Sequence, residues 1–77
     1  MKKRQAQEIS DKIVALLREE RLKKGITQYK MAKDTGMSKS SILYIENCTQ
    51  RPTLYTALLL ADYLGLDFSK VVQEASK

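Results

Sequence analysis

Few residues in this chain are able to stop a helix. Glycine occurs three times, at Gly25, Gly36 and Gly65, and proline once, at Pro52. Between these positions no stretch alternates apolar and polar residues in the manner of a half-buried strand. The sequence therefore predicts an all-α fold, a compact domain of five helices. Their expected ranges are about 10–24, 27–35, 38–47, 54–64 and 68–75.

Capping residues and helical spacing support these ranges. A Ser, Thr or Asp just before a helix accepts a hydrogen bond from a free N–H group of the first turn. The residues expected in this role are Thr27, Ser38, Thr53 and Asp67. The start of the first helix stays open between Arg4 and Ser10, because Ser10 or Asp11 would cap it while residues 2–8 also favour helix. One side of this helix is expected to carry Ile13, Leu16, Leu17 and Arg21.

The size and composition exclude several classes of protein. With 77 residues, the chain is close to the size at which one hydrophobic core just sustains a fold. We therefore expect a single domain over 1–77, with residues 1–9 as a basic extension that can belong to the first helix. Histidine is absent, and the one cysteine, Cys48, can form neither an internal disulfide nor a metal site by itself. We expect no enzymatic activity and no cofactor or metal.

The apolar segments are short. The apolar run Ala57–Ala61 is far too short to span a bilayer, and no apolar stretch follows the basic Met1–Arg4 as in a signal peptide. The single cysteine suits a reducing compartment. These features lead us to expect a cytoplasmic protein with no membrane contact.

Positive charge is concentrated at the start of the chain. Residues 1–30 contain nine Lys or Arg against four Asp or Glu, whereas residues 31–77 contain five of each. A net charge of +5 favours a polyanionic partner, above all nucleic acid, although it would equally serve solubility.

The segment between Gln28 and Asn47 has the spacing of two short helices that cross at a tight turn. Such a pair needs a small residue at the crossing and a turn residue that tolerates positive φ, and Ala32 and Gly36 meet these needs. Ile42 is expected to fill the space behind the second helix. The remaining inward positions belong to Met31, Met37 and Ile45. The first turn of the second helix then shows short polar and cationic side chains to solvent, a surface suited to the major groove of DNA.

These residues resemble the phage-repressor-like, or Cro/XRE-type, helix-turn-helix family over about Ile13–Val71. The resemblance is carried by Arg21, Gly25-Ile26-Thr27-Gln28, Met31-Ala32, Gly36-Met37-Ser38, Ile42, Ile45-Glu46, Pro52-Thr53 and Leu64-Gly65. It implies a five-helix, lambda-repressor-like domain that binds operator DNA, usually as a symmetric dimer.

The resemblance also implies roles for individual residues. The expected phosphate contacts are Thr27, Gln28, Ser41, Asn47, Thr49 and Arg51. The expected base-reading residues are Ser38, Lys39, Ser40 and Tyr44. Arg21 and Glu46 match an ion pair that the family buries between its first and third helices. Cys48 stands where the family normally has glycine, so we expect either a left-handed Asn47 or a different loop path.

The fourth helix carries more apolar residues than one inner stripe needs. Leu54, Leu58 and Ala61 are expected to face inward. A second stripe follows Tyr55, Leu59 and Tyr63, and this helix can also be buried nearly all round. The candidate dimer patch consists of Leu59, Tyr63, Leu66 and Phe68.

The expected function is sequence-specific binding of double-stranded DNA by a transcriptional regulator, a repressor acting as a homodimer on a palindromic operator. One alternative is the antitoxin of a toxin–antitoxin pair, with the toxin as its protein partner. Another is a protein–protein adaptor on the same scaffold. No small-molecule ligand is evident in the sequence.

Overall fold

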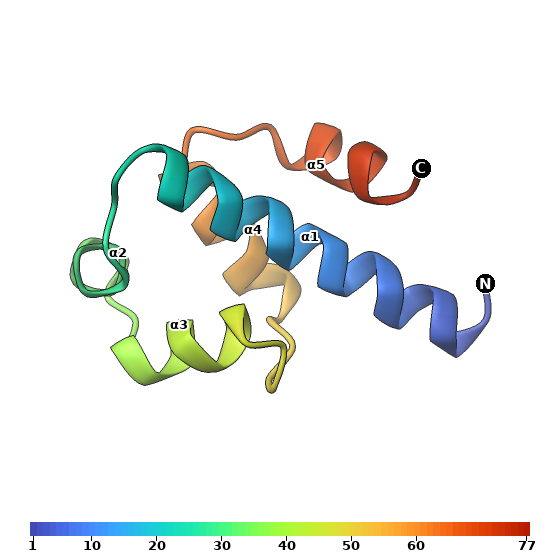
Figure 1. Ribbon diagram of the computed structural model, residues 1–77, viewed down its shortest axis with the longest axis horizontal. Coiled ribbons are helices and arrows are strands. Elements are labelled where there is room, and N and C mark those ends of the chain that lie inside the picture. Colours follow the sequence, from blue (N-terminus) through green and yellow to red (C-terminus); the bar gives the residue numbers. More distant parts are fainter.

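The first helix, α1, spans Lys3–Lys23 and sets the length of the molecule (Figure 1). At about 1.5 Å per residue its 21 residues extend roughly 31 Å, close to the 35 Å long axis of the protein. In the computed structural model, which describes residues 1–77, α1 therefore begins close to Arg4, the earlier of its two expected starts. The side chain of Gln5 accepts a hydrogen bond from the backbone N–H of Lys2 at 2.9 Å, and Ser10 and Asp11 lie inside the helix.

Four shorter helices follow, and each begins at the predicted cap. They are α2 (Gln28–Thr35), α3 (Lys39–Glu46), α4 (Leu54–Tyr63) and α5 (Phe68–Ala75). The side chains of Thr27, Ser38, Thr53 and Asp67 each accept a hydrogen bond from a backbone N–H of the following turn. The protein has no strands, and the predicted all-α fold is confirmed.

Three of the helices end in the same hydrogen-bond pattern. After α1 and α4 the left-handed position is filled by Gly25 and Gly65, with φ of +69° and +74°. After α3 the equivalent residue is Cys48, with φ of +59°, while Asn47 keeps a right-handed conformation. The backbone N–H groups of Cys48 and Thr49 donate to the carbonyls of Ile45 and Tyr44, as in a Schellman motif. Both alternatives expected from the sequence were wrong, since Cys48 itself adopts the strained conformation.

The hydrophobic core lies where α1 to α4 meet. Its largest fully buried side chains are those of Met31, Ile42 and Leu64. α1 contributes Val14 and Leu17 to the core, and Ile13 packs against it. Val14 was not among the residues predicted to face inward. The full cluster consists of Leu17, Met31, Ala32, Ile42, Leu60, Ala61 and Leu64.

The inner side predicted for α4 was right for Ala61 but wrong for Leu54 and Leu58. Its inner side is formed by Ala57, Leu60 and Ala61, whereas Leu54 and Leu58 are 68% and 46% exposed. Small residues at positions 57 and 61 let the helix approach its neighbours closely, which leaves the larger leucines outside. α4 is therefore not buried all round, and it keeps an apolar outer face.

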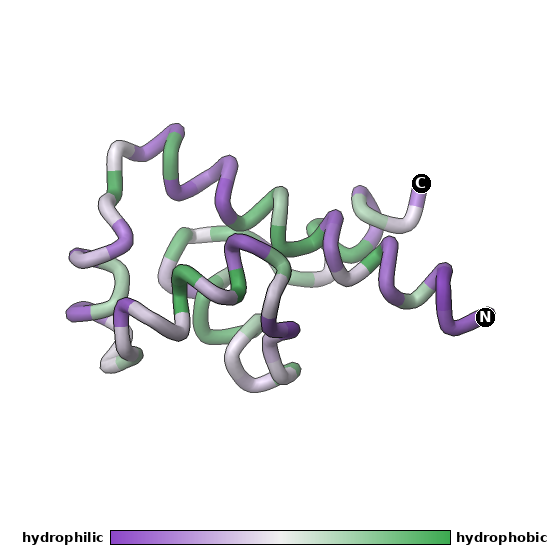
Figure 2. Tube along the Cα trace, turned by 60° about the horizontal axis from the view of Figure 1, so that its bottom comes forward, coloured by the Kyte–Doolittle hydropathy of each residue, from purple (hydrophilic) through white to green (hydrophobic).

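The helices surround this core in a fixed arrangement. α1 packs against α3 and α5, α2 packs against α3 and α4, and α5 also contacts α4. Figure 1 shows α3 and α5 on opposite sides of α1, with the start of α1 projecting beyond the body. In Figure 2 this projecting end is strongly hydrophilic, whereas the middle of the molecule is rich in hydrophobic residues. None of the helices has the length and apolar character needed to cross a membrane.

Candidate nucleic-acid interface

The turn between α2 and α3 has the geometry that the sequence predicted. Gly36 ends α2 with φ of +76°, a conformation that strains residues with a Cβ. Ala32 is buried at the crossing of the two helices, and Ile42 is fully buried behind α3. Together with Ile45 these contacts fix the inner side of α3 against the core.

The outer side of α3 is open to solvent. Lys39 and Ser40 are exposed in its first turn, and Tyr44, one turn further along, is 50% exposed. Leu43 beside Tyr44 is 39% exposed, which adds an apolar element to this side. Three of the four predicted base-reading residues therefore share one accessible surface.

The fourth, Ser38, is occupied in capping α3. Its hydroxyl oxygen accepts from the backbone N–H of Ser41 at 3.0 Å, and its proton is donated to the Ser41 hydroxyl at 2.8 Å. The Ser41 hydroxyl proton has no acceptor within the chain. Thr27 is similar, because its oxygen accepts from the backbone N–H of Lys30 at 3.0 Å while its own proton stays free. The free donors thus belong to Thr27 and Ser41.

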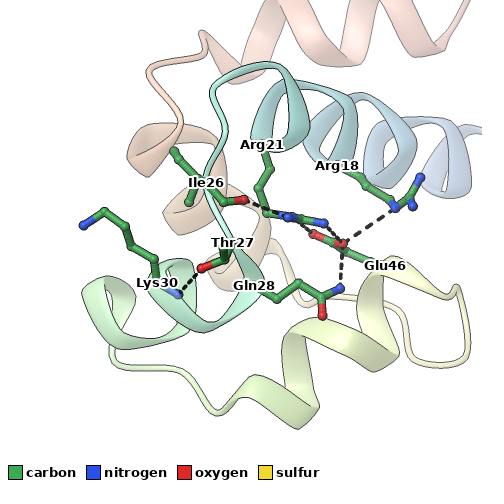
Figure 3. Close-up of polar contacts among 7 residues, drawn as sticks. All are labelled: Arg18, Arg21, Ile26, Thr27, Gln28, Lys30 and Glu46. Atoms are coloured by element: carbon green, nitrogen blue, oxygen red, sulfur yellow. Dashed lines mark hydrogen bonds and ion pairs between the residues drawn. The ribbon is translucent and has the colours of Figure 1, made fainter.

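A buried polar cluster connects α3 to α1 and α2 (Figure 3). Arg21 donates from Nε and Nη2 to the two carboxylate oxygens of Glu46, at 2.7 and 2.8 Å, and from Nη1 to the carbonyl of Ile26 at 2.8 Å. Gln28 Nε2 donates to Glu46 Oε1 at 3.0 Å. The side chains of Arg21 and Glu46 are only 7% and 6% exposed, and no buried side-chain nitrogen or oxygen lacks a partner. The structure thus brings Arg21 and Glu46 together as the family resemblance implied.

The environment of Glu46 keeps its carboxylate ionised. Desolvation is the largest single influence and raises its pKa, but hydrogen bonds from Arg21 and Gln28, with the charges of Arg21 and Arg18, outweigh it. The net pKa of Glu46 is lowered. Gln28 uses one amide hydrogen in this cluster, so a phosphate would be bound by its second amide hydrogen or by the free backbone N–H groups that begin α2.

The loop after α3 contains the other expected phosphate contacts. Both Asn47 and Arg51 are exposed. Thr49 is committed internally, since its hydroxyl and its backbone N–H both donate to the carbonyl of Tyr44 at 3.0 Å. Of the expected contacts in this loop, the side chains available to an external anion are therefore those of Asn47 and Arg51.

Cys48 lies between these residues and is exposed. Partial desolvation raises the pKa of its thiol, and the neighbouring carboxylate of Asp11 raises it further, while Arg51 acts in the opposite direction. The thiolate is the reactive form of cysteine, so this environment makes Cys48 less reactive.

The four residues expected to form a dimer patch are half-buried rather than open. Tyr63, Leu66 and Phe68 pack against the core cluster. The hydroxyl of Tyr63 also donates to Asp34 Oδ2 at 2.6 Å, which connects α4 to α2. Leu59 is likewise half-buried. The large exposed apolar side chains of α4 are instead Leu54, Tyr55 and Leu58.

Two residues near the interface were missed from the sequence. Arg18 lies one turn before Arg21 and places its Nε 3.7 Å from Glu46 Oε1, a second cation that i, i+3 spacing could have indicated. Tyr29, beside Gln28 in the first turn of α2, is 66% exposed. Its exposure could have been predicted, because the inner positions of α2 were already assigned to Met31 and Ala32, which leaves the aromatic side chain of Tyr29 on the outer side.

The comparison with protein families agrees with this geometry. A helix-turn-helix family model matches residues 17–71, which covers the last third of α1, all of α2, α3 and α4, and the first half of α5. No curated protein and no solved structure was found to match the chain. The matched segment contains the turn at Gly36, the buried cluster at Glu46 and the exposed side of α3. The chain therefore belongs to the Cro/C1-type helix-turn-helix family, whose members are DNA-binding transcription regulators.

Proposed function

We propose that this protein is a sequence-specific repressor that binds a palindromic operator as a symmetric dimer. The observation that carries the proposal is the contrast between the two sides of α3. Its inner side is fixed by Ile42, Ile45 and the Glu46 cluster, while its outer side exposes Lys39, Ser40 and Tyr44. A rigidly held helix with such an outer side fits the major groove of B-DNA.

Each outer residue has a chemistry suited to base edges. The Lys39 ammonium donates to guanine O6 or N7, and Ser40 donates or accepts. Tyr44 offers its hydroxyl or places its ring against a thymine methyl group. Ser38 is kept as the cap of α3, because its proton and its oxygen are both engaged with Ser41.

Phosphate contacts on both sides of α3 would fix the helix in the groove. On one side are Thr27, Gln28 and Ser41, with the backbone N–H groups that begin α2 and α3. On the other side are Asn47 and Arg51; Thr49 would join them only by giving up its hydrogen bond to Tyr44. These contacts carry no sequence information, so specificity is assigned to the outer side of α3.

The proposal is tested by selecting bound sites from a random pool of duplex DNA. A palindromic consensus is expected, and recovery of no consensus would contradict sequence-specific binding. Affinity for the selected site is expected to fall by about a thousandfold or more between roughly 50 and 200 mM salt if the dimer makes about six to ten phosphate contacts. A flat salt response would contradict direct DNA binding.

Substitutions then separate reading from phosphate binding. Lys39→Ala and Tyr44→Ala should each lower the ratio of operator to scrambled-DNA affinity, by about 1–3 kcal/mol per lost base contact. Arg51→Ala is the matched control and should weaken both affinities by similar factors. Arg51 serves this purpose better than Gln28, because Gln28 also holds Glu46. If both α3 variants keep the wild-type ratio, α3 is not the reading helix.

A further inference from the structure

Leu43 is an apolar side chain on the outer side of α3 that has no part in the function proposed above. It is 39% exposed, and Tyr44 beside it is 50% exposed. The other residues of this side, Lys39, Ser40 and Asn47, are exposed and polar or charged. A single exposed leucine is ordinary on a protein surface. This one, however, lies on the side of α3 that is proposed to enter the major groove.

Helix geometry shows how directly Leu43 faces outward. Ile42 and Ile45 are buried, and the direction midway between them defines the inner side of α3. At about 100° per residue, Leu43 and Tyr44 lie roughly 50° to either side of the opposite, outward direction. Lys39 lies roughly 90° from the outward direction on the same scale. Leu43 and Tyr44 therefore flank the middle of the surface that a bound duplex would meet.

The backbone that carries this pair is held on both residues. The Leu43 carbonyl accepts a hydrogen bond from the backbone N–H of Asn47 at 3.0 Å. The Tyr44 carbonyl accepts from the backbone N–H groups of Thr49 and Gln50 at 3.0 and 3.2 Å. Both side chains would thus enter a groove from an ordered helix, and only their rotamers would lose freedom on binding.

One group in the major groove is chemically matched to a leucine. The base edges there present hydrogen-bond donors and acceptors, and the C5-methyl group of thymine is the apolar exception. A donor or acceptor covered by leucine would lose its water without gaining a new partner, which costs free energy. A methyl group covered by leucine is instead removed from water with a gain in free energy. An apolar side chain at this place therefore selects for a methyl group.

We infer that Leu43, together with the ring of Tyr44, forms an apolar pair that reads the C5-methyl group of a thymine in the operator. The inference rests on the proposed function and adds Leu43 to its reading residues. It also decides between the two contacts open to Tyr44, in favour of the ring over the hydroxyl. 5-Methylcytosine carries the same methyl group at the same ring position, so methylation of a cytosine at this place would supply the same contact.

Operators with uracil in place of thymine, one position at a time, test the inference, because uracil lacks only the methyl group. The wild-type chain should bind about fourfold more weakly when uracil replaces the contacted thymine, the factor that corresponds to one buried methyl-sized group. Leu43→Ala should lose most of this difference between the two operators. Leu58→Ala should keep it and is the matched control, since Leu58 is a leucine of α4 that is 46% exposed. Circular dichroism checks that both variants fold.

A second measurement separates the methyl group from the other properties of thymine. With cytosine at the contacted position, 5-methylation should raise the affinity by a similar factor, and methylation without effect would contradict a contact to the methyl group. Equal affinity for thymine and uracil at every position would overturn the inference, as would a Leu43→Ala variant that keeps the full difference. In these cases a specific operator would still support the proposed function. A chain that selects no DNA sequence would defeat the proposed function, and the inference with it.

Discussion

Two carboxylates connect α2 to other helices, and both have a pKa below the ordinary value, yet their surroundings differ. Glu46 is nearly inaccessible and accepts hydrogen bonds from Arg21 and Gln28. Asp34 lies at the surface, where it accepts a hydrogen bond from Tyr63 and forms an ion pair with Lys30 at 3.1 Å. The pKa of Asp34 is lowered first by the hydrogen bond from Tyr63 and then by that from Lys30.

The difference teaches that a lowered pKa does not measure how much a contact matters to the fold. Water can replace Tyr63 and Lys30 around Asp34, so the loss of either partner leaves a solvated charge. Water cannot replace Arg21 around Glu46 without opening the core, so the loss of Arg21 leaves a buried charge with fewer partners. We therefore expect the Glu46 cluster to hold α3 in place and the Asp34 pair to contribute little.

The largest expected effect comes from breaking the buried cluster. Arg21→Ala should lower the free energy of unfolding by about 3–5 kcal/mol, because it strands the Glu46 carboxylate. Replacing Arg21 and Glu46 together by apolar residues of similar volume should cost much less. Denaturant unfolding measures the free energy of unfolding of the wild type, of Arg21→Ala and of the double variant.

Arg18→Ala is the matched control for that measurement. Arg18 is 54% exposed and lies 3.7 Å from the same carboxylate. An exposed ion pair of this kind is worth under about 1 kcal/mol. If Arg21→Ala costs no more than Arg18→Ala, burial does not distinguish the two cations and the comparison with Asp34 fails.

Acid should weaken the Glu46 cluster. Because the pKa of Glu46 is lower in the folded protein, its contribution is complete above the unfolded pKa, about 4.3, and is lost as the pH falls through the folded value. The stability difference between wild type and Glu46→Gln should therefore shrink from neutral pH into this acid range. The pKa of Asp34 is also lowered, so the corresponding difference for Asp34→Asn should change in the same direction. Unfolding curves collected across the acid range measure both changes, and a difference between wild type and Glu46→Gln that stays constant with pH would contradict the lowered pKa of Glu46.

Local signals predicted the site better than the packing around it. Thr27, Ser38 and Gly36 act within one or two turns of the chain, so the boundaries of α2 and α3 could be read from the sequence. The pairing of Arg21 with Glu46 came from the family resemblance. Its extension to Gln28 and Arg18 depends on how three helices meet, which no local pattern encodes.

The error in α4 has a related physical cause. Its sequence, LYTALLLADY, is apolar on several sides, so it has no polar stripe that would indicate which side faces solvent. The close approach of neighbouring helices selected the small Ala57 and Ala61 for the interior. The same ambiguity concealed the exposed face of Leu54, Tyr55 and Leu58. At Cys48, the residue type indicated that a left-handed conformation would be strained. The backbone nevertheless adopts this conformation at Cys48 itself.

A smaller effect on stability should come from the strained backbone of Cys48, which lies two residues after Glu46. The Glu46 cluster fixes the last turn of α3, and Cys48 then closes the helix with φ of +59°. Cys48→Gly removes the steric cost of a Cβ in this conformation and should raise the free energy of unfolding by about 1 kcal/mol. Gly65→Ala, at the equivalent position after α4, should lower it by a similar amount. Thermal unfolding checks that Cys48→Gly is stabilised and Gly65→Ala is destabilised. A destabilised Cys48→Gly variant would show that the thiol makes a contact worth more than the strain.

The smallest effect is expected at the exposed carboxylate. Tyr63→Phe removes the hydrogen bond from the Tyr63 hydroxyl to Asp34 but keeps the ring that packs against the core. Water takes the place of the lost donor, so the melting temperature at neutral pH should fall only slightly. The pKa of Asp34 should nevertheless rise toward its ordinary value, because the bond from Tyr63 is the main cause of its depression. NMR titration of the Asp34 carboxyl group measures this shift, with Tyr55→Phe as a control that leaves Asp34 untouched. A raised pKa with only a small fall in the melting temperature would show that this surface pair contributes little to the fold. A loss of stability comparable to that of Arg21→Ala would instead give the surface pair a structural role equal to that of the buried cluster.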